Sequence, residues 1–490
     1  MQTDLDPEGT RLPIKIDSTS NGEWMPVGLS KAARAANQEA HADAATFSRK
    51  LNISRRQFLI SAAGAATTLL AFNRVHARAG ARGGYYDIPR DAALENPLAQ
   101  ASLEGSEFIF DVQNHCVDPA ASWRDTTDGT RWHYILTHLF GQRQKNSPGL
   151  LDAYSAQQLV KDVYLDSDTQ VGIVTALWGA RGGNPTSIDY AREAQQVVAA
   201  LGTRKRALIH GGVMPNEPGA LEFMDVQANE YKVAAWKLYP QWGPDGVGFF
   251  MDDEKVGIPF LEKVRSSGVK IVCAHRGLPL PFLLYEYSDP ADIARAAAKY
   301  PDITFICYHS GFEPGVREGV YNPDKPAGVD RLIKAHQAAG FSRNQGNLYA
   351  ELGSVWMFHL RDPEACAHLM GKLLKYFGEE RICWGTDSIW FGSPQDQIQA
   401  LRTFQITPEF QEKYGYPQIT PLMRARIFGL NAAGPYRLDV DQIKREARAD
   451  PIGVLRAGYR EAPNPGFLSY GPKTEPEYRR LLAESAGRPG

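Results

Sequence analysis

The chain has 490 residues, enough for several domains, although a single α/β barrel with extensions also accounts for this length. Hydrophobic residues make up 43% and charged residues 22%, so the composition is that of an ordinary globular protein. The net charge of −2 gives no reason to expect nucleic acid or an acidic membrane surface as a partner.

The first 50 residues show no pattern of a folded unit. They are polar and rich in Ala, Asn and Asp, and they carry no sustained apolar period. We therefore expect residues 1–50 to form a disordered leader.

Residues 51–79 have the layout of an export signal. The basic pair Arg55-Arg56 precedes a short, weakly apolar run, and Ala77-Arg78-Ala79 provides an A-x-A cleavage site. The run is too short to span a bilayer, so we expect no stable membrane span. The segment from Ser54 to Leu59 resembles the twin-arginine signal, which implies export by the twin-arginine machinery to the periplasm or the extracellular space. The alternative is an amphipathic helix that begins at Ser54 as its cap.

Beyond a Gly/Arg-rich linker at 80–105, strand-like apolar runs alternate with amphipathic, helix-like stretches. The expected strands are 106–113, 171–178, 206–214, 233–239, 269–275, 303–309, 347–353 and 381–387. The expected helices are near 151–164, 187–201, 217–229, 253–267, 289–299, 327–339, 363–377 and 394–404. This alternation predicts a (β/α)8 TIM barrel over 106–437. A doubly wound open sheet is the alternative, but no Gly-rich phosphate loop follows the first strand.

The last segment, 438–490, is charged and rich in Pro and Gly. We expect this C-terminal extension to wrap the surface or to stay mobile.

Polar residues follow four of the expected strands. Asp387 ends the last strand, His275 and His309 end two earlier ones, and His115 follows the first. Active-site residues of barrel enzymes occupy these strand ends. Three imidazoles and one carboxylate form a metal-binding or acid–base set, provided that the fold brings them together.

Cysteines Cys273, Cys307 and Cys383 lie inside expected strands, at even spacing from the site residues that follow them. Side chains alternate along a strand, so we expect all three to fill the barrel interior on the site's side. Cys116, next to His115, is the cysteine that could touch a site.

A set of short motifs resembles the amidohydrolase superfamily, in the amidohydrolase-related branch with aminocarboxymuconate-semialdehyde decarboxylase, resorcylate decarboxylases and several lactonases. The motifs, in order, are Asp111-Val112-Gln113-Asn114-His115, Lys237-Leu238-Tyr239-Pro240, Ala274-His275-Arg276-Gly277, His309-Ser310-Gly311, Trp384-Gly385-Thr386-Asp387 and Ile427-Phe428-Gly429-Leu430-Asn431-Ala432-Ala433. The resemblance implies that His115, His275 and Asp387 bind one divalent metal ion and that His309 transfers protons.

Gln113 stands where this family carries the first histidine of a His-X-His pair. A glutamine oxygen is a weaker zinc ligand than imidazole, so metal affinity should fall or the preference should shift from zinc toward manganese. His115, His275 and Asp387 still leave an open coordination position, as a catalytic zinc requires.

Three residues near the expected site are candidates for substrate binding. Lys237 or Arg276 could meet a carboxylate or an oxyanion, with a solvated salt bridge as the alternative for either. Trp390 could contact a flat ligand, as could Trp178, Trp242 and Trp384, although aromatic side chains also fill barrel mouths by packing alone.

Together these features predict a metal-dependent hydrolase of a small cyclic ester, amide or related carbonyl compound. In this reaction Asp387 accepts the proton of the attacking water, and His309 stabilises or protonates the departing oxygen. One alternative is non-oxidative decarboxylation of an aromatic or unsaturated acid, and another is a barrel that binds a ligand without turnover. The expected partner is a small-molecule substrate, and a homo-oligomer stays open.

Overall fold

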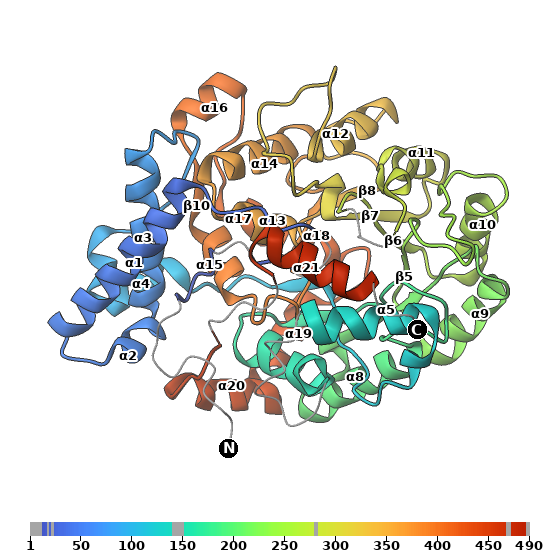
Figure 1. The fold of residues 1–490 in the computed structure, drawn as a ribbon, viewed down its shortest axis with the longest axis horizontal. Coiled ribbons are helices and arrows are strands. Elements are labelled where there is room, and N and C mark those ends of the chain that lie inside the picture. The colour runs from blue at the N-terminus through green and yellow to red at the C-terminus, as the bar shows by residue number, and fades with distance from the viewer. Residues whose placement is uncertain are drawn as a thin grey trace.

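A parallel eight-stranded sheet forms the centre of the computed structural model, which describes residues 12–16, 19–20, 24–139, 151–278, 283–466 and 472–486 (Figure 1). The strands follow one another in chain order, each hydrogen-bonded to the next. They are β2 (Phe110–Asn114), β3 (Val171–Val174), β4 (Ala207–Gly212), β5 (Ala235–Leu238), β6 (Ile271–His275), β7 (Thr304–Tyr308), β8 (Leu348–Glu351) and β9 (Ile382–Cys383).

The sheet closes because the chain after β9 returns to β2. The Val112 N–H donates to the Trp384 carbonyl at 3.0 Å, and the Asp387 N–H donates to the Gln113 carbonyl at 3.0 Å. The predicted TIM barrel is therefore confirmed, and the open doubly wound sheet is excluded. The last strand is shorter than expected, because regular pairing covers only Ile382–Cys383 and the rest of 381–387 is loop.

Helices surround the barrel and cover the outer side of its strands. They are α7 (Ala156–Leu159), α8 (Ile188–Leu201), α9 (Ala220–Val226), α10 (Gly257–Ser267), α11 (Ala291–Lys299), α12 (Val329–Ala338), α14 (Pro363–Tyr376) and α15 (Gln395–Thr403). Shorter helices lie in the loops and after the barrel: α5 (Thr127–Tyr134), α13 (Val355–His359), α16 (Pro408–Tyr414), α17 (Pro421–Ala425) and α18 (Asn431–Ala433). These helices match the expected positions, except that the one expected at 151–164 is a short α7 continued by a π-helical segment, η5 (Val160–Leu165).

Alternate strand residues face two separate hydrophobic clusters. Cys273, Tyr308 and Cys383 belong to the barrel interior, whereas Cys307 packs in the larger cluster between strands and helices. The expectation that Cys307 fills the interior on the site's side is therefore wrong. Since Tyr308 points inward, regular alternation would also turn His309 outward.

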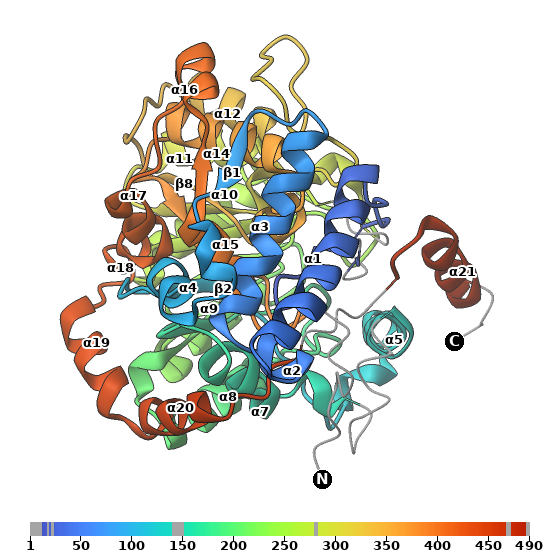
Figure 2. The ribbon, with the colours of Figure 1, turned by 90° about the vertical axis from the view of Figure 1, so that its left-hand side faces the viewer.

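Tyr436 closes the bottom of the barrel. Its ring packs edge-on against Phe110, and its hydroxyl lies 2.9 Å from His210 Nε2 and 3.6 Å from Cys273 Sγ. Figure 2 shows α17, α18 and α19 (Val440–Ala449) on one side of the molecule, and α5 and α21 (Glu475–Ala486) on the opposite side. The strand carboxyl ends, and with them the barrel mouth, lie away from the Tyr436 plug.

The described part of residues 1–50 is folded, contrary to the expectation of a disordered leader, whereas residues 1–11, 17–18 and 21–23 of that expected leader lie outside the described residues. Helix α1 (Lys31–Lys50) packs along α3 (Ala62–Arg78), and α2 (Arg55–Leu59) joins them. The buried face of α1 consists of Ala33, Ala36, Ala40, Ala44 and Ser48. Alanine gives a weak hydrophobic signal in the sequence, but a stripe of small side chains lets two helices approach closely.

Ser54 caps α2 through a capping box. Its hydroxyl accepts from the Gln57 N–H at 3.1 Å, and the Gln57 side chain accepts from the Ser54 N–H at 2.9 Å. Both arginines that follow have side-chain partners, because Arg55 Nη2 donates to His41 Nδ1 at 2.6 Å and Arg56 Nη2 donates to Asn464 Oδ1. These contacts concern the folded chain, and export stays a prediction.

The 80–105 segment, expected as a linker, also contains regular structure. Strand β1 (Gly84–Tyr86) pairs antiparallel with β10 (Phe404–Ile406), and α4 (Asn96–Leu103) follows. This segment joins the N-terminal helices to the barrel.

The C-terminal extension wraps the surface as helices α19 and α20 (Pro451–Glu461). Asp168 accepts from Arg402 of α15 and from Arg456 and Arg460 of α20. This buried carboxylate therefore ties the extension to the barrel.

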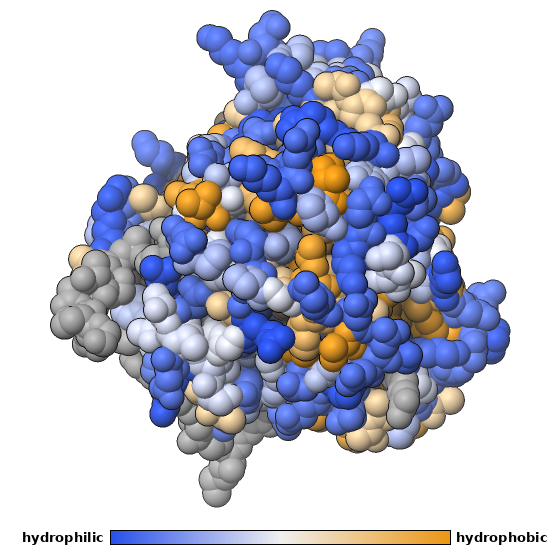
Figure 3. Space-filling view, turned by 90° about the vertical axis from the view of Figure 1, so that its right-hand side faces the viewer, coloured by the Kyte–Doolittle hydropathy of each residue, from blue (hydrophilic) through white to orange (hydrophobic). Residues whose placement is uncertain are grey.

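Hydrophilic side chains predominate on the face that carries α9 and α10, with a few separate apolar patches (Figure 3). Within the described ranges, we find no helix with the length and apolar character needed to cross a bilayer.

Candidate functional site

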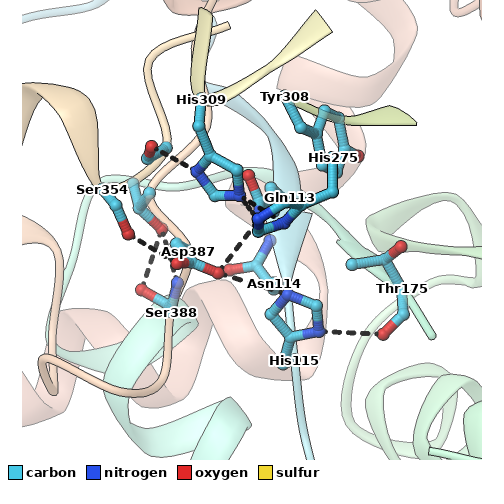
Figure 4. Close-up of polar contacts among 12 residues, drawn as sticks. Gln113, Asn114, His115, Thr175, His275, Tyr308, His309, Ser354, Asp387 and Ser388 are labelled. Carbon is cyan, nitrogen blue, oxygen red and sulfur yellow. Dashed lines mark hydrogen bonds and ion pairs between the residues drawn. The ribbon is translucent and has the colours of Figure 1, made fainter. Parts of the chain in front are cut away.

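The barrel mouth gathers all four polar strand-end residues predicted from the sequence (Figure 4). His115, His275, His309 and Asp387 are each at most 1% exposed. Burial at this level strengthens every electrostatic interaction among them.

His115 faces Asp387 across the mouth. Its Nδ1–H donates to the Thr175 carbonyl at 3.0 Å, which leaves the Nε2 lone pair 3.2 Å from Asp387 Oδ1. Burial lowers the pKa of His115, so the ring is neutral near pH 7. The Trp390 indole stacks on this imidazole with 5.7 Å between ring centres.

His275 and His309 face each other in the same way. His275 Nε2 donates to the Leu278 carbonyl at 2.9 Å, and His309 Nδ1 donates to the Gly353 carbonyl at 2.8 Å. Their remaining nitrogens, His275 Nδ1 and His309 Nε2, lie 3.1 Å apart. Burial lowers the pKa of His275 well below its usual value and that of His309 to about 4, so both rings are neutral near pH 7.

Asp387 provides the negative charge of the site. Its Oδ2 accepts from the Ser354 hydroxyl at 2.5 Å, and its Oδ1 accepts from Gln113 Nε2 at 2.9 Å. Burial alone would raise the pKa of Asp387, but the hydrogen bond from Ser354 favours the charged form, and the pKa lies below its usual value. The carboxylate is therefore ionised near neutral pH.

Three of these residues adopt a left-handed backbone conformation. The φ angles are 65° at His309, 58° at Ser354 and 60° at Asp387. A non-glycine residue in this region costs about 1–3 kcal/mol. At His309 the turn brings the imidazole back to the mouth, although strand alternation would direct it outward.

Gln113 lies between these donors. Its Nε2 group donates to Asp387 Oδ1 and lies 3.4 Å from His309 Nε2. Its Oε1 is buried without a hydrogen-bond partner among the described residues. In this orientation the amide presents hydrogens, and not its oxygen, to the site.

Two buried carboxyl groups support the site from below. Asp111 accepts from the Thr386 N–H at 3.1 Å, and Glu351 accepts from the His309 N–H at 2.9 Å and the Gly353 N–H at 2.6 Å. Burial raises the pKa of Asp111 to about 7 and that of Glu351 to about 8.

Glu351 and Ser354 are site residues that the sequence patterns described above do not indicate. Their signal is the Glu351-Leu352-Gly353-Ser354 run, where two polar residues with a glycine follow the apolar part of β8. This resembles the other strand ends that carry site residues.

A metal ion fits the chemistry of this donor set. Three neutral imidazoles direct lone pairs at one another or at a carboxylate, and these donors are the ones zinc prefers. Four donors around a tetrahedral zinc lie about 3.3 Å from one another, if each is 2.0–2.1 Å from the ion. The observed separation of His115 Nε2 and Asp387 Oδ1 is 3.2 Å, and His275 Nδ1 lies 3.1 Å from His309 Nε2.

The fit still needs a small rearrangement. In the described part of the chain, no group of three or more His, Cys, Asp or Glu side chains is spaced as a ready-made metal centre. The donors lie slightly too close together, and the Gln113 amide hydrogens point among them. Separation by a few tenths of an ångström and rotation of this amide would give the ion its space.

The substrate-binding candidates have different surroundings. Lys237 is fully buried at the site, with Nζ 4.0 Å from the centre of the Tyr308 ring and 4.4 Å from that of Tyr239. Arg276 is buried but turned away, because Nε and Nη2 donate to the Asp292 carboxylate. Both side chains are buried and not solvated, and the Arg276 guanidinium is engaged by Asp292 in this structure.

Of the four candidate tryptophans, Trp390 packs against a site imidazole. Trp384 instead packs on Phe428 in the outer cluster, and Trp178 packs on Trp132. Trp242 donates to Asp128 Oδ2 at 3.1 Å. Burial raises the pKa of the Cys116 thiol, so this cysteine is no thiolate nucleophile.

The closed barrel and its mouth define a (β/α)8-barrel protein with a buried histidine–carboxylate site, the arrangement of an enzyme active site. Residues 162–438, more than half of the chain, match the family model described as amidohydrolase. The chain therefore belongs to the amidohydrolase family. None of the curated proteins matches it.

Several solved structures resemble the chain at low identity. An uncharacterised TIM-barrel protein from Bordetella bronchiseptica is 15% identical with a TM-score of 0.41, over 69% of this chain and 99% of that one. A 5-carboxyvanillate decarboxylase from Sphingomonas paucimobilis is 14% identical with a TM-score of 0.42, over 68% and 100%. A dihydroxybenzoic acid decarboxylase from Polaromonas sp. JS666, with bound manganese and 2-nitroresorcinol, is 15% identical with a TM-score of 0.39, over 68% and 98%. Likeness at this level does not bear on the reaction.

Proposed function

We propose that the protein is a metal-dependent hydrolase of a small cyclic ester, amide or related carbonyl compound. The observation that carries this proposal is the convergence of neutral imidazole lone pairs on one another and on an ionised carboxylate. Such an arrangement attracts a divalent cation and leaves its donors unprotonated for binding.

His115, His275 and Asp387 would hold the ion, with Gln113 as a fourth donor if its amide rotates. Zinc suits the imidazoles, and the neutral oxygen of Gln113 makes manganese the alternative. The bound ion would polarise a carbonyl group and make a water molecule more acidic. Rotation would move the Gln113 NH2 group toward Gly353, where Glu351 Oε1 also lies.

The chain's own residues would move the protons. Asp387 is ionised near neutral pH, so it can accept a proton from the attacking water. His309 Nε2 carries a lone pair, because Nδ1–H is held by the Gly353 carbonyl. It can therefore take up a proton and deliver it to the departing oxygen.

A second candidate is decarboxylation of an aromatic or unsaturated acid, with His309 as the proton donor to carbon. The buried Lys237 ammonium between Tyr239 and Tyr308 favours it, because a cation beside aromatic rings suits a flat substrate that bears a carboxylate. In a third candidate, Gln113 prevents metal binding and the barrel only binds its ligand.

Turnover assays separate these candidates. Purified protein supplied with one equivalent of Zn²⁺ or Mn²⁺ is screened against lactones, with acid release as the signal, and against hydroxybenzoates, with CO₂ release as the signal. Hydrolysis of a lactone that is absent in Asp387→Asn is the expected result. CO₂ release would favour the decarboxylase, and neither signal with no bound metal would favour the binding protein.

We further propose export through the twin-arginine machinery, with a periplasmic or extracellular location. The support is the arginine pair and the Ala77-Arg78-Ala79 site in the sequence.

A further inference from the structure

A cavity of about 770 Å³ lies between the loops that follow β3 and β4, and we call it the β3–β4 cavity. Small residues leave this space open: Ala176 and Gly212 line it near the strand ends, and Gly219 and Ala220 line it at the start of α9. The volume falls within the range of about 300–1,000 Å³ that is usual for small-molecule sites. The cavity can therefore hold a small organic molecule.

The inner end of the β3–β4 cavity adjoins the candidate site. Gly212 is paired with Lys237 in the barrel sheet, and Ala176 directly follows Thr175. The Thr175 carbonyl accepts from His115 Nδ1 at 3.0 Å. A ligand at this end therefore lies beside the strand residues that position His115 and Lys237.

Gln227 presents an unused acceptor to the cavity that it lines. It is 1% exposed, and its Nε2 donates to the Gly212 carbonyl at 3.1 Å, which fixes the orientation of the amide. Its Oε1 lies 2.9 Å from the point where a Cβ of Gly211 would stand, and no described residue donates a hydrogen bond to it. A buried amide oxygen without a partner is unfavourable, so a ligand that donates to this oxygen is stabilised.

Apolar side chains form part of the cavity wall. Ile188, Met214 and Phe223 line it, and Met214 is only 4% exposed. The Arg181 guanidinium covers the Phe223 ring, 4.3 Å from its centre. The wall therefore suits the apolar body of a ligand.

The charged side chains of the lining stand at its entrance and have partners there. Asp189 accepts from the Tyr231 hydroxyl, and Glu217 Oε1 accepts from the Arg181 N–H at 3.1 Å. Arg181 and Asp189 are exposed to solvent, whereas Gln227 is buried. Solvated charges add little to the binding of a charged ligand, so the buried part of the cavity favours a neutral one.

We propose that the β3–β4 cavity is a binding site for a neutral compound with an apolar body and an N–H or O–H donor, and that this donor bonds to Gln227 Oε1. The apolar wall accounts for the body, and the unused amide oxygen accounts for the donor. The inference depends neither on the proposed metal ion nor on the hydrolase reaction.

Calorimetric titration of the full-length protein with indole and with benzofuran tests the proposal. The two molecules have nearly the same shape, but only indole carries an N–H donor. We expect indole to bind about three- to tenfold more tightly, as one net hydrogen bond predicts. Gln227→Met should remove this preference, because Met keeps the volume of the side chain and supplies no amide oxygen.

Gln241→Met is the matched control. Gln241 is 2% exposed, and its Nε2 also donates to a glycine carbonyl, that of Gly277 at 3.3 Å, but it does not line the cavity. The preference for indole should persist in this variant. Ala220→Leu should weaken the binding of both probes about fivefold or more, because the added methylenes compete for the same space.

Equal affinity of indole and benzofuran for the wild type, or a preference for indole that persists in folded Gln227→Met, would overturn the proposal. If Gln227→Met does not fold, Ala220→Leu decides: weaker binding of both probes supports the cavity as the site, and unchanged binding overturns it. The readout needs no turnover, so it stays valid if the proposed hydrolase activity is absent.

Discussion

His275 and His309 face each other with Nδ1 and Nε2 only 3.1 Å apart, although both nitrogens are acceptors. The N–H of each ring donates to a backbone carbonyl: that of His275 to Leu278 and that of His309 to Gly353. Two lone pairs at this distance repel each other unless a proton or a metal ion lies beside them. The lowered pKa values of both rings disfavour the proton near pH 7, so both lone pairs are available: in our assignment His275 gives its lone pair to the metal ion, and His309 uses its own to take up a proton.

The two histidines should differ in their response to substitution. In our assignment His309 transfers protons, so His309→Asn should lose about 100- to 10,000-fold in turnover while metal content and fold stay close to wild type. His275→Asn should lose metal and activity together, because a metal ligand is removed. Metal analysis alongside turnover measures both.

His368→Asn is the control, since His368 is buried outside the site and bonded to Tyr416. Equal loss of metal in His309→Asn and His275→Asn would contradict the division of roles and make His309 a ligand.

Gln113→His should tighten metal binding. An imidazole replaces an amide whose hydrogens now point toward Asp387 and His309, so the site gains a donor and loses an obstruction. Competition with a chelator measures the affinity. Gln113→Leu is the comparison and should bind no more tightly than wild type. Unchanged affinity in Gln113→His would mean that position 113 does not contact the ion.

Asp168→Asn should destabilise the protein by about 3 kcal/mol, because three guanidinium groups lose their buried counter-charge. Burial alone would raise the pKa of Asp168, but Arg456, Arg402 and Arg460 hold it well below its usual value. A depressed folded-state pKa stabilises the protein above the unfolded value of 3.8, and this stabilisation is lost as the pH falls.

Urea unfolding at pH 7 and pH 3 measures both effects, with a smaller difference between wild type and Asp168→Asn at pH 3. Arg460→Ala should cost at most about 1 kcal/mol, since this side chain is half exposed. A pH-independent difference would show that the charge of Asp168 is not the stabilising factor.

Arg55-Arg56→Lys-Lys should leave the precursor in the cytoplasm, because a twin-arginine signal depends on that pair. Fractionation of cells that express each version measures the location. Normal export of the lysine version would mean that the segment acts only as the capped helix α2.

The barrel could be predicted because its signal is repeated: eight apolar runs, each followed by an amphipathic stretch. The site could be located because His115, His275, His309 and Asp387 share one position relative to these runs. The direction of His309 could not be deduced, since it depends on a positive φ and not on strand alternation.

Other features depend on partners far away in the sequence. Arg276 follows His275 directly, yet its guanidinium binds Asp292 on the outer side of the barrel. Helix α1 was missed because its buried face is alanine, which becomes informative only once α3 is known to lie against it.

The central claim is that the barrel mouth holds one divalent ion through His115, His275 and Asp387. Metal analysis of the purified protein, after incubation with Zn²⁺ or Mn²⁺ and removal of excess ion, tests it most directly. We predict one ion per chain in the wild type and none in the double variant His115→Asn/His275→Asn. No stoichiometric metal in the wild type, or the same metal content in the double variant, would contradict the account.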